Sequence, residues 1–354
     1  MSNYHEEQNR ENILRLREHL KVLPPFLAEF FRNRADYTST RTRLGYAYDL
    51  KLFFGFLINE TRDFAANTMD NFTLNDLGKV TVDHIEEFLE YLSYYTTSRQ
   101  RQGAEYHVEN KTEGKSRKLS AIRSMFAYFY KKGKIGANPA ELVATPPTKE
   151  KAKVYLDANE IANLLDEADS GDNLTEKQKD YHAITRSRDV AILSLFAGTG
   201  IRISEAVGLN LEDINIKDGS FRVIRKGGDE AVLYFGDEVA EAISEYLDKR
   251  LLIITKPGHE RALFLSMQNR RITARAVQNL VKKYAGLANS FKKITPHKLR
   301  TSFGTNMYRQ TGDIYLVADL LGHKDVNTTR KSYADTKEEA GRRAVRELKL
   351  RKDD

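Results

Sequence analysis

The chain contains no cysteine and no long apolar run. The absence of cysteine excludes disulfide bonds and thiolate metal sites, and it is typical of proteins from a reducing compartment. The longest apolar stretch, near residues 190–198, is far shorter than the roughly 20 residues that a membrane-spanning helix needs. The first residues, Met1–Glu7, lack the apolar core of a signal peptide. We therefore expect a cytoplasmic protein without a membrane partner.

Length and charge suggest a globular protein with a polyanionic partner. With 354 residues and a hydrophobic content of 40%, the chain is long enough for two domains. It carries 57 Lys and Arg residues against 50 Asp and Glu residues, which gives a net charge of +7. A basic balance of this kind favours nucleic acid as a partner, although many basic proteins bind none.

Apolar residues recur at intervals near 3.6 in three stretches before residue 135, which predicts three amphipathic helices. One or two further helices are expected within residues 6–34, interrupted at Pro24-Pro25. A Lys-rich segment follows Pro146-Pro147, and this combination is typical of a linker. The three apolar stripes are Tyr46, Leu50, Phe53, Phe54 and Leu57; Val82, Ile85, Leu89 and Leu92; and Leu119, Ile122, Phe126 and Phe129.

These patterns divide the chain into three parts. We expect a helical N-terminal domain at residues 1–147, the linker at residues 148–156 and a second domain at residues 157–354. In the second domain, β-rich runs on both sides of a Gly-Gly turn predict a small antiparallel sheet near residues 213–235. Residues 337–350 are predicted as a tail helix.

Two motifs of the second domain carry arginine and histidine side chains. In residues 295–300 (Thr-Pro-His-Lys-Leu-Arg), His297 and Arg300 share one face of a predicted helix. In residues 198–205 (Gly-Thr-Gly-Ile-Arg-Ile-Ser-Glu), Arg202 follows a Gly-rich turn, and Glu205 can orient it. A phosphodiester under attack gains negative charge on its non-bridging oxygens. Arginine binds such oxygens bidentately and stays charged, so two arginines suit this chemistry.

The candidate nucleophile is Tyr333. Because the reference pKa of a phenol is near 10, only about one tyrosine in a thousand is ionised at neutral pH. His297, with an ordinary pKa of about 6.5, can accept the phenol proton. The departing 5′ oxygen also needs a proton, and Lys226, at the tip of the predicted hairpin, is placed to supply it.

Each motif alone has an ordinary structural explanation. A His-x-x-Arg pair on a helix is more often solvated or salt-bridged, and Gly-Thr-Gly-Ile-Arg is also typical of a helix cap. Tyr333 is one of 18 tyrosines, most of which pack in a core. In this order and at these spacings, however, the motifs together favour the functional interpretation.

The set resembles the tyrosine recombinase (phage integrase) family, whose catalytic pattern is Arg, Lys, His-x-x-Arg, His or Trp, and Tyr. The resemblance is strong over residues 157–336 and looser over 40–147. It implies a mainly α fold with a small antiparallel β-sheet, in which a helical core-binding domain and a catalytic domain form a two-domain DNA clamp. The implied catalytic residues are Arg202, Lys226, His297, Arg300, His323 and Tyr333, supported by Glu205.

The same resemblance implies a reaction. The enzyme would cleave and rejoin double-stranded DNA through a 3′-phosphotyrosyl intermediate, a free 5′ hydroxyl and a Holliday junction. It would need no metal, ATP or other cofactor, since the ester bond energy is kept in the link between protein and DNA.

The sequence departs from the family pattern before the nucleophile. Tyr333 follows His323 at a spacing of ten positions, where the family usually has nine, and Ser332 is the extra residue. On a regular helix one residue turns a side chain by about 100°, so a turn or a bulge must absorb the insertion. Tyr308 is the nearest competing nucleophile, and its position does not match the pattern.

A basic segment precedes the predicted linker. Between Arg99 and Lys134 there are ten Lys and Arg residues against three Glu residues. The last helix of the N-terminal domain carries basic, hydroxyl and aromatic groups opposite its apolar stripe, a combination that suits phosphates and base edges. An ordinary solvated helix face is the alternative. The candidate DNA-binding residues are Arg117, Ser120, Ser124, Tyr128 and Lys131.

Within the family, the first 35 residues and the Arg-Lys-Gly-Gly hairpin resemble the single-recombinase Xer proteins of the XerS kind. This implies chromosome dimer resolution at a dif-like site, as part of chromosome partition at cell division, by a homotetramer on two sites activated by a septal DNA translocase. An integrase or excisionase of a mobile element, acting at attachment sites, is the first alternative. A type IB topoisomerase-like enzyme and a catalytically inactive DNA-binding protein are the others.

Overall fold

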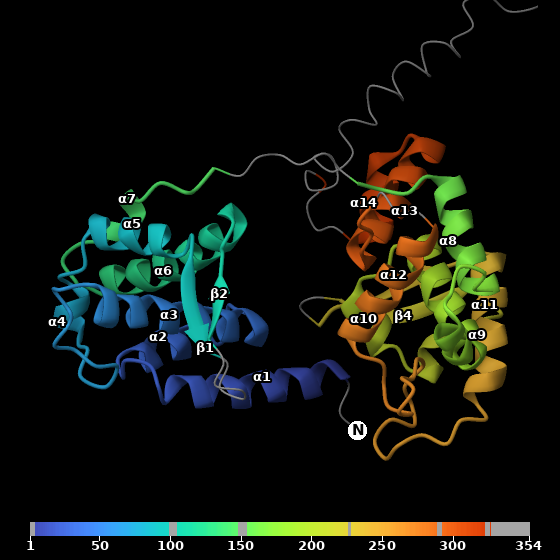
Figure 1. The fold of residues 1–354 in the computed structure, drawn as a ribbon, viewed down its shortest axis with the longest axis horizontal. Coiled ribbons are helices and arrows are strands. Elements are labelled where there is room, and N and C mark those ends of the chain that lie inside the picture. The colour runs from blue at the N-terminus through green and yellow to red at the C-terminus, as the bar shows by residue number, and fades with distance from the viewer. Residues whose placement is uncertain are drawn as a thin grey trace, which may run out of the picture. The chain divides into compact units, whose positions relative to one another are not determined.

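The computed structural model describes residues 4–98, 105–147, 154–225, 228–288, 292–322 and Val326. The chain divides into two compact units, Met1–Lys151 and Ala152–Asp354 (Figure 1). The division falls within the range predicted for the linker. Both units are mainly helical in their described parts, and each contains one small antiparallel sheet.

The first unit is a helical bundle with one hairpin. The break between its first two helices contains Pro24-Pro25, as expected, because proline cannot continue a helix. Its helices are α1 (Tyr4–Leu20), α2 (Leu27–Asn33), α3 (Thr40–Glu60), α4 (Leu74–Leu77), α5 (Val82–Tyr91), α6 (Thr112–Lys131) and α7 (Pro139–Leu142). The three predicted amphipathic helices correspond to α3, α5 and α6 and are confirmed.

Phenylalanine rings fill the core of the first unit. Phe54 is fully buried, and its ring meets those of Phe53 and Phe72 edge to face, with centroids 5.6 and 5.1 Å apart. Phe88 of α5 and Phe129 of α6 are also fully buried. The apolar stripes of α3, α5 and α6 therefore face one another.

A hairpin between α5 and α6 was not predicted. Strand β1 (Tyr95–Ser98) pairs antiparallel with β2 (Glu105–Val108). Its two short strands carry Thr, Ser, Glu and His residues among the tyrosines, so no alternation of apolar and polar residues marks them. Residues 99–104 lie outside the described part.

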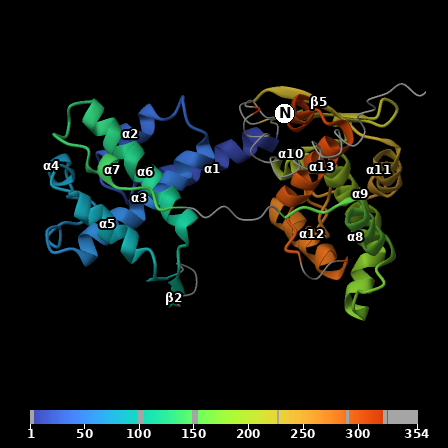
Figure 2. The ribbon, with the colours of Figure 1, turned by 90° about the horizontal axis from the view of Figure 1, so that it is seen from above.

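The second unit contains a long central helix, against which several of its other helices pack. Helix α9 packs against α8, α11 and α13 (Figure 2). The predicted sheet near residues 213–235 is confirmed, with the strand order β3-β4-β5. The elements are α8 (Ala158–Ser170), α9 (Glu176–Thr199), α10 (Ile203–Gly208), β3 (Ile214–Asn215), β4 (Ser220–Ile224), β5 (Glu230–Tyr234), α11 (Asp237–Arg250), α12 (Ala274–Ala288), α13 (Pro296–Thr311) and α14 (Ile314–Leu321).

No helix among the described residues combines the length and the apolar character needed to cross a membrane. The predicted tail helix at residues 337–350 lies outside the described part.

Removal of a ring from the first core should destabilise the first unit. We expect Phe54→Ala to lower its free energy of unfolding by about 3 to 5 kcal/mol, because the substitution removes a fully buried ring and leaves a cavity. The same truncation at Tyr37, which is 82% exposed, should change it by less than about 0.5 kcal/mol. Urea denaturation followed by circular dichroism measures both values. Equal losses for the two variants would contradict the described core.

Candidate active site

Arg202 lies between α9 and α10, at the position that caps α10. Its Nη1 donates to Oε1 of Glu205 at 2.9 Å, and its backbone N–H donates to Oε2 of the same carboxylate at 2.9 Å. Its Nη2 donates to the carbonyl oxygen of Gly322 at 3.2 Å. Glu205 is buried, whereas the Arg202 side chain keeps 32% of its surface exposed. The contact expected from the three-residue spacing is therefore present, and it fixes a guanidinium that solvent still reaches.

Arg300 is held differently. It projects from α13 and is only 6% exposed. Its Nη1 donates to the carbonyl oxygen of Gly200 at 2.5 Å, and its Nη2 donates to the carbonyl oxygen of Leu321. These carbonyls belong to the C-terminal ends of α9 and α14, and the neighbouring Gly322 carbonyl binds Arg202. Both arginines therefore converge on the C-terminal end of α14, and Arg300 also contacts the end of α9.

His297 stands one turn before Arg300, in the first turn of α13. Thr295 caps this helix, because its hydroxyl accepts from the backbone N–H of Lys298, and Pro296 is the first helical residue. His297 is exposed, yet partial desolvation and then the positive charges of Arg300, Arg202 and Lys298 lower the pKa of its imidazole below 6.5. At neutral pH the ring is mostly neutral and able to accept a proton.

Three predicted site residues are thus described and lie together: Arg202, His297 and Arg300. Lys226, His323 and Tyr333 fall outside the described residues, so their positions remain predictions. Tyr308, the competing tyrosine, lies on α13 and is only 9% exposed. This burial, together with a position that does not match the family pattern, argues against Tyr308 as nucleophile.

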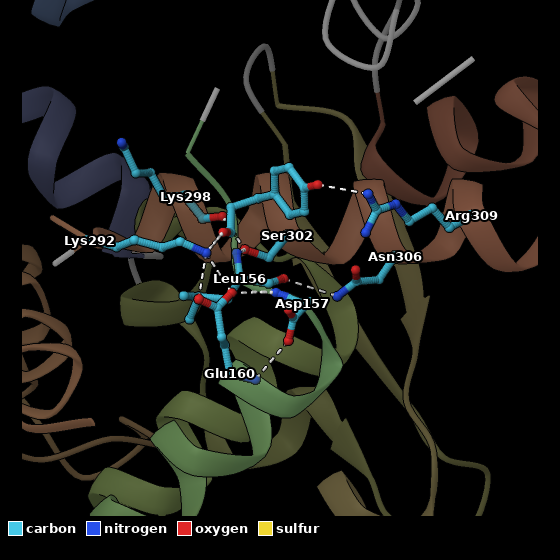
Figure 3. A network of polar contacts seen from close by, with 9 residues as sticks. Leu156, Asp157, Glu160, Lys292, Lys298, Ser302, Asn306 and Arg309 are labelled. Atoms are coloured by element: carbon cyan, nitrogen blue, oxygen red, sulfur yellow. Dashed lines mark hydrogen bonds and ion pairs between the residues drawn. The ribbon is translucent and has the colours of Figure 1, made fainter. Parts of the chain in front are cut away.

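The residues just before α8 pack along α13 (Figure 3). The backbone N–H of Leu156 donates to the Ser302 hydroxyl at 2.8 Å, and the Asn306 side chain donates to the Leu156 carbonyl at 3.3 Å. Lys292 Nζ pairs with both carboxylate oxygens of Glu160, at 2.5 and 2.6 Å. Helix α13 therefore receives support from the first residues of the second unit as well as from α9.

The predicted polar face of α6 needs one correction. Tyr128 is only 9% exposed, its hydroxyl donates to Glu29 Oε1 at 2.8 Å, and its ring contacts that of Phe30. Helix α2 covers this part of α6, so the prediction that Tyr128 faces DNA is wrong. Ser120 and Lys131 are exposed and Ser124 is half-buried, so these three residues remain candidates.

Arg117 of the same helix has a structural partner. Its guanidinium donates two hydrogen bonds to the carboxylate of Asp49 on α3, which is 2% exposed. Burial raises the pKa of Asp49, against the lowering effect of the Arg117 and Lys118 charges. Asp49 was not predicted as a buried residue, although an acidic residue beside the apolar stripe of α3 is a signal for a buried ion pair.

The chain has known relatives that cover most of its length. Residues 154–340 match the phage integrase family. The chain is 35% identical over 319 residues to the tyrosine recombinase XerC of Caldanaerobacter subterraneus subsp. tengcongensis, and the alignment covers 87% of this chain and 82% of that relative.

Two solved structures share the fold. XerH site-specific recombinase bound to a palindromic difH substrate, in a post-cleavage complex, has a TM-score of 0.63 at 19% identity, covering 90% of this chain and 83% of that one. A lambda integrase tetramer bound to a Holliday junction has a TM-score of 0.60 at 16% identity, covering 93% and 79%.

The relatives define the class as tyrosine recombinases. The chain belongs to the phage integrase family of tyrosine recombinases. The mainly helical, two-domain fold that the resemblance implied is confirmed, and the chain is an enzyme. The narrower resemblance to the XerS kind remains a prediction.

The charges around His297 generate a prediction in solution. We expect an imidazole pKa below 6.5 in the free protein, and a higher pKa in Arg202→Ala, because this change removes a positive charge and leaves Glu205 without its partner. NMR titration of the His297 ring measures the pKa, with His84 of the first unit as the internal reference signal. A pKa that is the same in both proteins would contradict the described geometry.

Proposed function

We propose that this recombinase cleaves one strand of a specific DNA duplex and forms a 3′-phosphotyrosyl bond at Tyr333. The observation that supports it best is the convergence of Arg202 and Arg300, with the neutral imidazole of His297 beside them. Two guanidiniums and a base are the groups that attack on a phosphodiester requires.

The proposed reaction exchanges one ester for another. The phenol oxygen of Tyr333 attacks the phosphorus while His297 accepts the phenol proton. The bond from phosphorus to the 5′ oxygen breaks, and Lys226 donates a proton to that oxygen. Arg202 and Arg300 bind the two non-bridging oxygens. His323 is the remaining catalytic residue that the family pattern implies. Attack by a 5′ hydroxyl from another strand reverses these steps and releases the tyrosine.

The arginines act as prepositioned donors. Their hydrogen bonds to Glu205 and to the helix-end carbonyls fix both guanidiniums before DNA arrives, so little reorganisation is needed in the transition state. Loss of one such donor should raise the barrier by roughly 3 to 4 kcal/mol, a rate factor of about 100 to 1000. Lysine cannot replace the bidentate contact.

For the biological role, we propose Xer-like chromosome dimer resolution. The similarity to XerC supports it, as does the shared fold with XerH on its difH substrate. The enzyme would act as a homotetramer on two dif-like sites, pass through a Holliday junction and respond to a septal DNA translocase during chromosome partition and cell division. A cytoplasmic location fits this role.

Integration or excision of a mobile element is the main alternative, because integrases use the same catalytic pattern. A dimer-resolution enzyme acts on two identical chromosomal sites, whereas an integrase joins unlike attachment sites. A topoisomerase-like enzyme would relax supercoils as a monomer without forming junctions. An inactive DNA-binding relative would make no covalent adduct.

A nicked duplex tests the nucleophile directly. The duplex carries the site that the protein selects from fragmented genomic DNA, with the nick close to the cleavage position so that the short 5′-hydroxyl fragment diffuses away. We expect a covalent adduct on a denaturing gel, mapped by mass spectrometry to the peptide that contains Tyr333. Tyr333→Phe should bind the duplex and form no adduct.

Tyr308→Phe is the matched control, because it removes a phenol hydroxyl from the same unit. This variant should form the adduct at a rate close to that of the unmodified protein. An adduct on any other residue would overturn the assignment of Tyr333, and no adduct at all would favour the inactive relative.

Helix α6 provides a test of DNA binding that does not disturb folding. Replacement of Arg117 by Glu would leave the buried carboxylate of Asp49 without its ion-pair partner, and this loss is destabilising by itself. Exposed Lys131 has no such buried partner in the part of the chain that the structure describes, so Lys131→Glu should weaken binding and reduce the slope of log affinity against log salt by about 1.

The control is Lys177→Glu, which changes the net charge equally at an exposed position of α9. Fluorescence anisotropy at several salt concentrations gives both slopes. If the two variants lose affinity equally, the effect is one of net charge and α6 is not a DNA-binding helix.

A further inference from the structure

Arg225 follows strand β4 and is the last described residue before Lys226. Its backbone N–H donates to the Asp229 carbonyl at 2.8 Å, and its own carbonyl accepts from the Gly228 N–H at 3.0 Å. These bonds close the turn of the hairpin formed by β4 and β5. The backbone of Arg225 is therefore fixed, and so is the direction in which its side chain leaves the strand.

The guanidinium of Arg225 lies directly against Gly322. A β-carbon on Gly322 would overlap Nη1 and Cζ of Arg225 and would stand 2.7 Å from its Nε. Gly322 also has a φ of 61°, in the left-handed region, where it ends α14. Only glycine at this position permits both the helix end and the close approach of the arginine.

Three guanidiniums therefore meet at the C-terminal end of α14. The Gly322 carbonyl accepts from Arg202 at 3.2 Å, and the Leu321 carbonyl accepts from Arg300. Arg225 approaches the Cα side of Gly322. The three arginines come from the α9–α10 turn, from α13 and from the β4–β5 hairpin, so the fold brings together charges that are remote in sequence.

The third guanidinium has no counter-charge among the described residues. Its Nε is shielded from solvent and has no hydrogen-bond partner in the described part of the chain. Arg222, on the same strand, pairs with Asp213 at 3.5 Å, and Arg202 pairs with Glu205. Arg225 is half-buried, and three positive charges this close together repel one another until an anion joins them.

We propose that Arg225 is a third phosphate-binding arginine of this site, whose guanidinium donates to a non-bridging oxygen of the phosphodiester bound by Arg202 and Arg300. This inference rests on the proposed function and extends it, since the family pattern of Arg, Lys, His-x-x-Arg, His or Trp, and Tyr contains no such residue. The added donor stabilises the negative charge that those oxygens gain in the transition state.

A purely structural role makes a different prediction. A guanidinium near the end of a helix stabilises the partial negative charge of the last carbonyls. In that case Arg225 would support α14, and the effect of its removal on the reaction rate would not depend on the charge of the bound phosphate. The two roles are separated by a change in the DNA rather than by a further change in the protein.

The test compares Arg225→Ala with the unmodified protein on two nicked duplexes. One carries the natural phosphodiester at the cleavage position, and the other carries a methylphosphonate there, in which a methyl group replaces one charged oxygen. On the natural duplex we expect the variant to form the covalent adduct about 100-fold more slowly. On one methylphosphonate stereoisomer this ratio should shrink at least about tenfold, because the charge that Arg225 neutralises is gone.

Arg222→Ala is the matched control, since it removes an exposed arginine from the same strand, and its rate should stay near that of the unmodified protein. Arg225→Lys keeps the charge and should recover part of the rate. It is also used in place of Arg225→Ala if thermal unfolding shows that the alanine variant is not folded.

A normal adduct rate in Arg225→Ala, or a loss equally large on both duplexes, would overturn the inference. If the unmodified protein forms no adduct, the proposed function fails as well, whereas a normal variant beside an active unmodified protein removes only the role of Arg225.

Discussion

The C-terminal ends of α9 and α14 hold both arginines of the active site, and the catalytic unit is built around these contacts. The last carbonyls of a helix lack intrahelical partners and carry partial negative charge. The carbonyls of Gly200 and Leu321 accept from Arg300, and the Gly322 carbonyl accepts from Arg202. A guanidinium as buried as that of Arg300 needs such acceptors. Displacement of the α14 end would therefore disturb both arginines at once.

Glycine makes this arrangement possible at both helix ends. Gly200, like Gly322, has a φ of 61°. A β-carbon there would stand 2.6 Å from Phe303 Cδ1 and 3.0 Å from Leu321 Cδ2. Gly200, which ends α9, therefore lets α13 and α14 pack against that helix end. Its role is close packing, and the position of Arg202 follows from that packing.

Local patterns in the sequence predicted most of the fold and part of the site. Periodicity predicted α3, α5 and α6, and the Gly-Gly turn predicted the β4–β5 hairpin, because each signal lies within one element. Contacts between distant elements could not be predicted in this way. Glu29 and Tyr128 are 99 positions apart, and Arg300 and Gly200 are 100 apart. A sequence motif also cannot indicate which backbone carbonyl will act as an acceptor, since every residue has a carbonyl.

The choice of carbonyls rather than carboxylates as partners has a consequence for phosphate binding. A carboxylate would hold Arg300 equally well, but it would also repel the phosphodiester, by about 4 kcal/mol at 4 Å for an effective dielectric constant of 20. Carbonyl dipoles orient a guanidinium and leave its full charge available. Glu205 is the one carboxylate bound to these arginines among the described residues; it is buried and contacts the Arg202 side chain through Nη1 alone. The site therefore fixes its arginines while keeping the positive charge that a phosphodiester under attack requires.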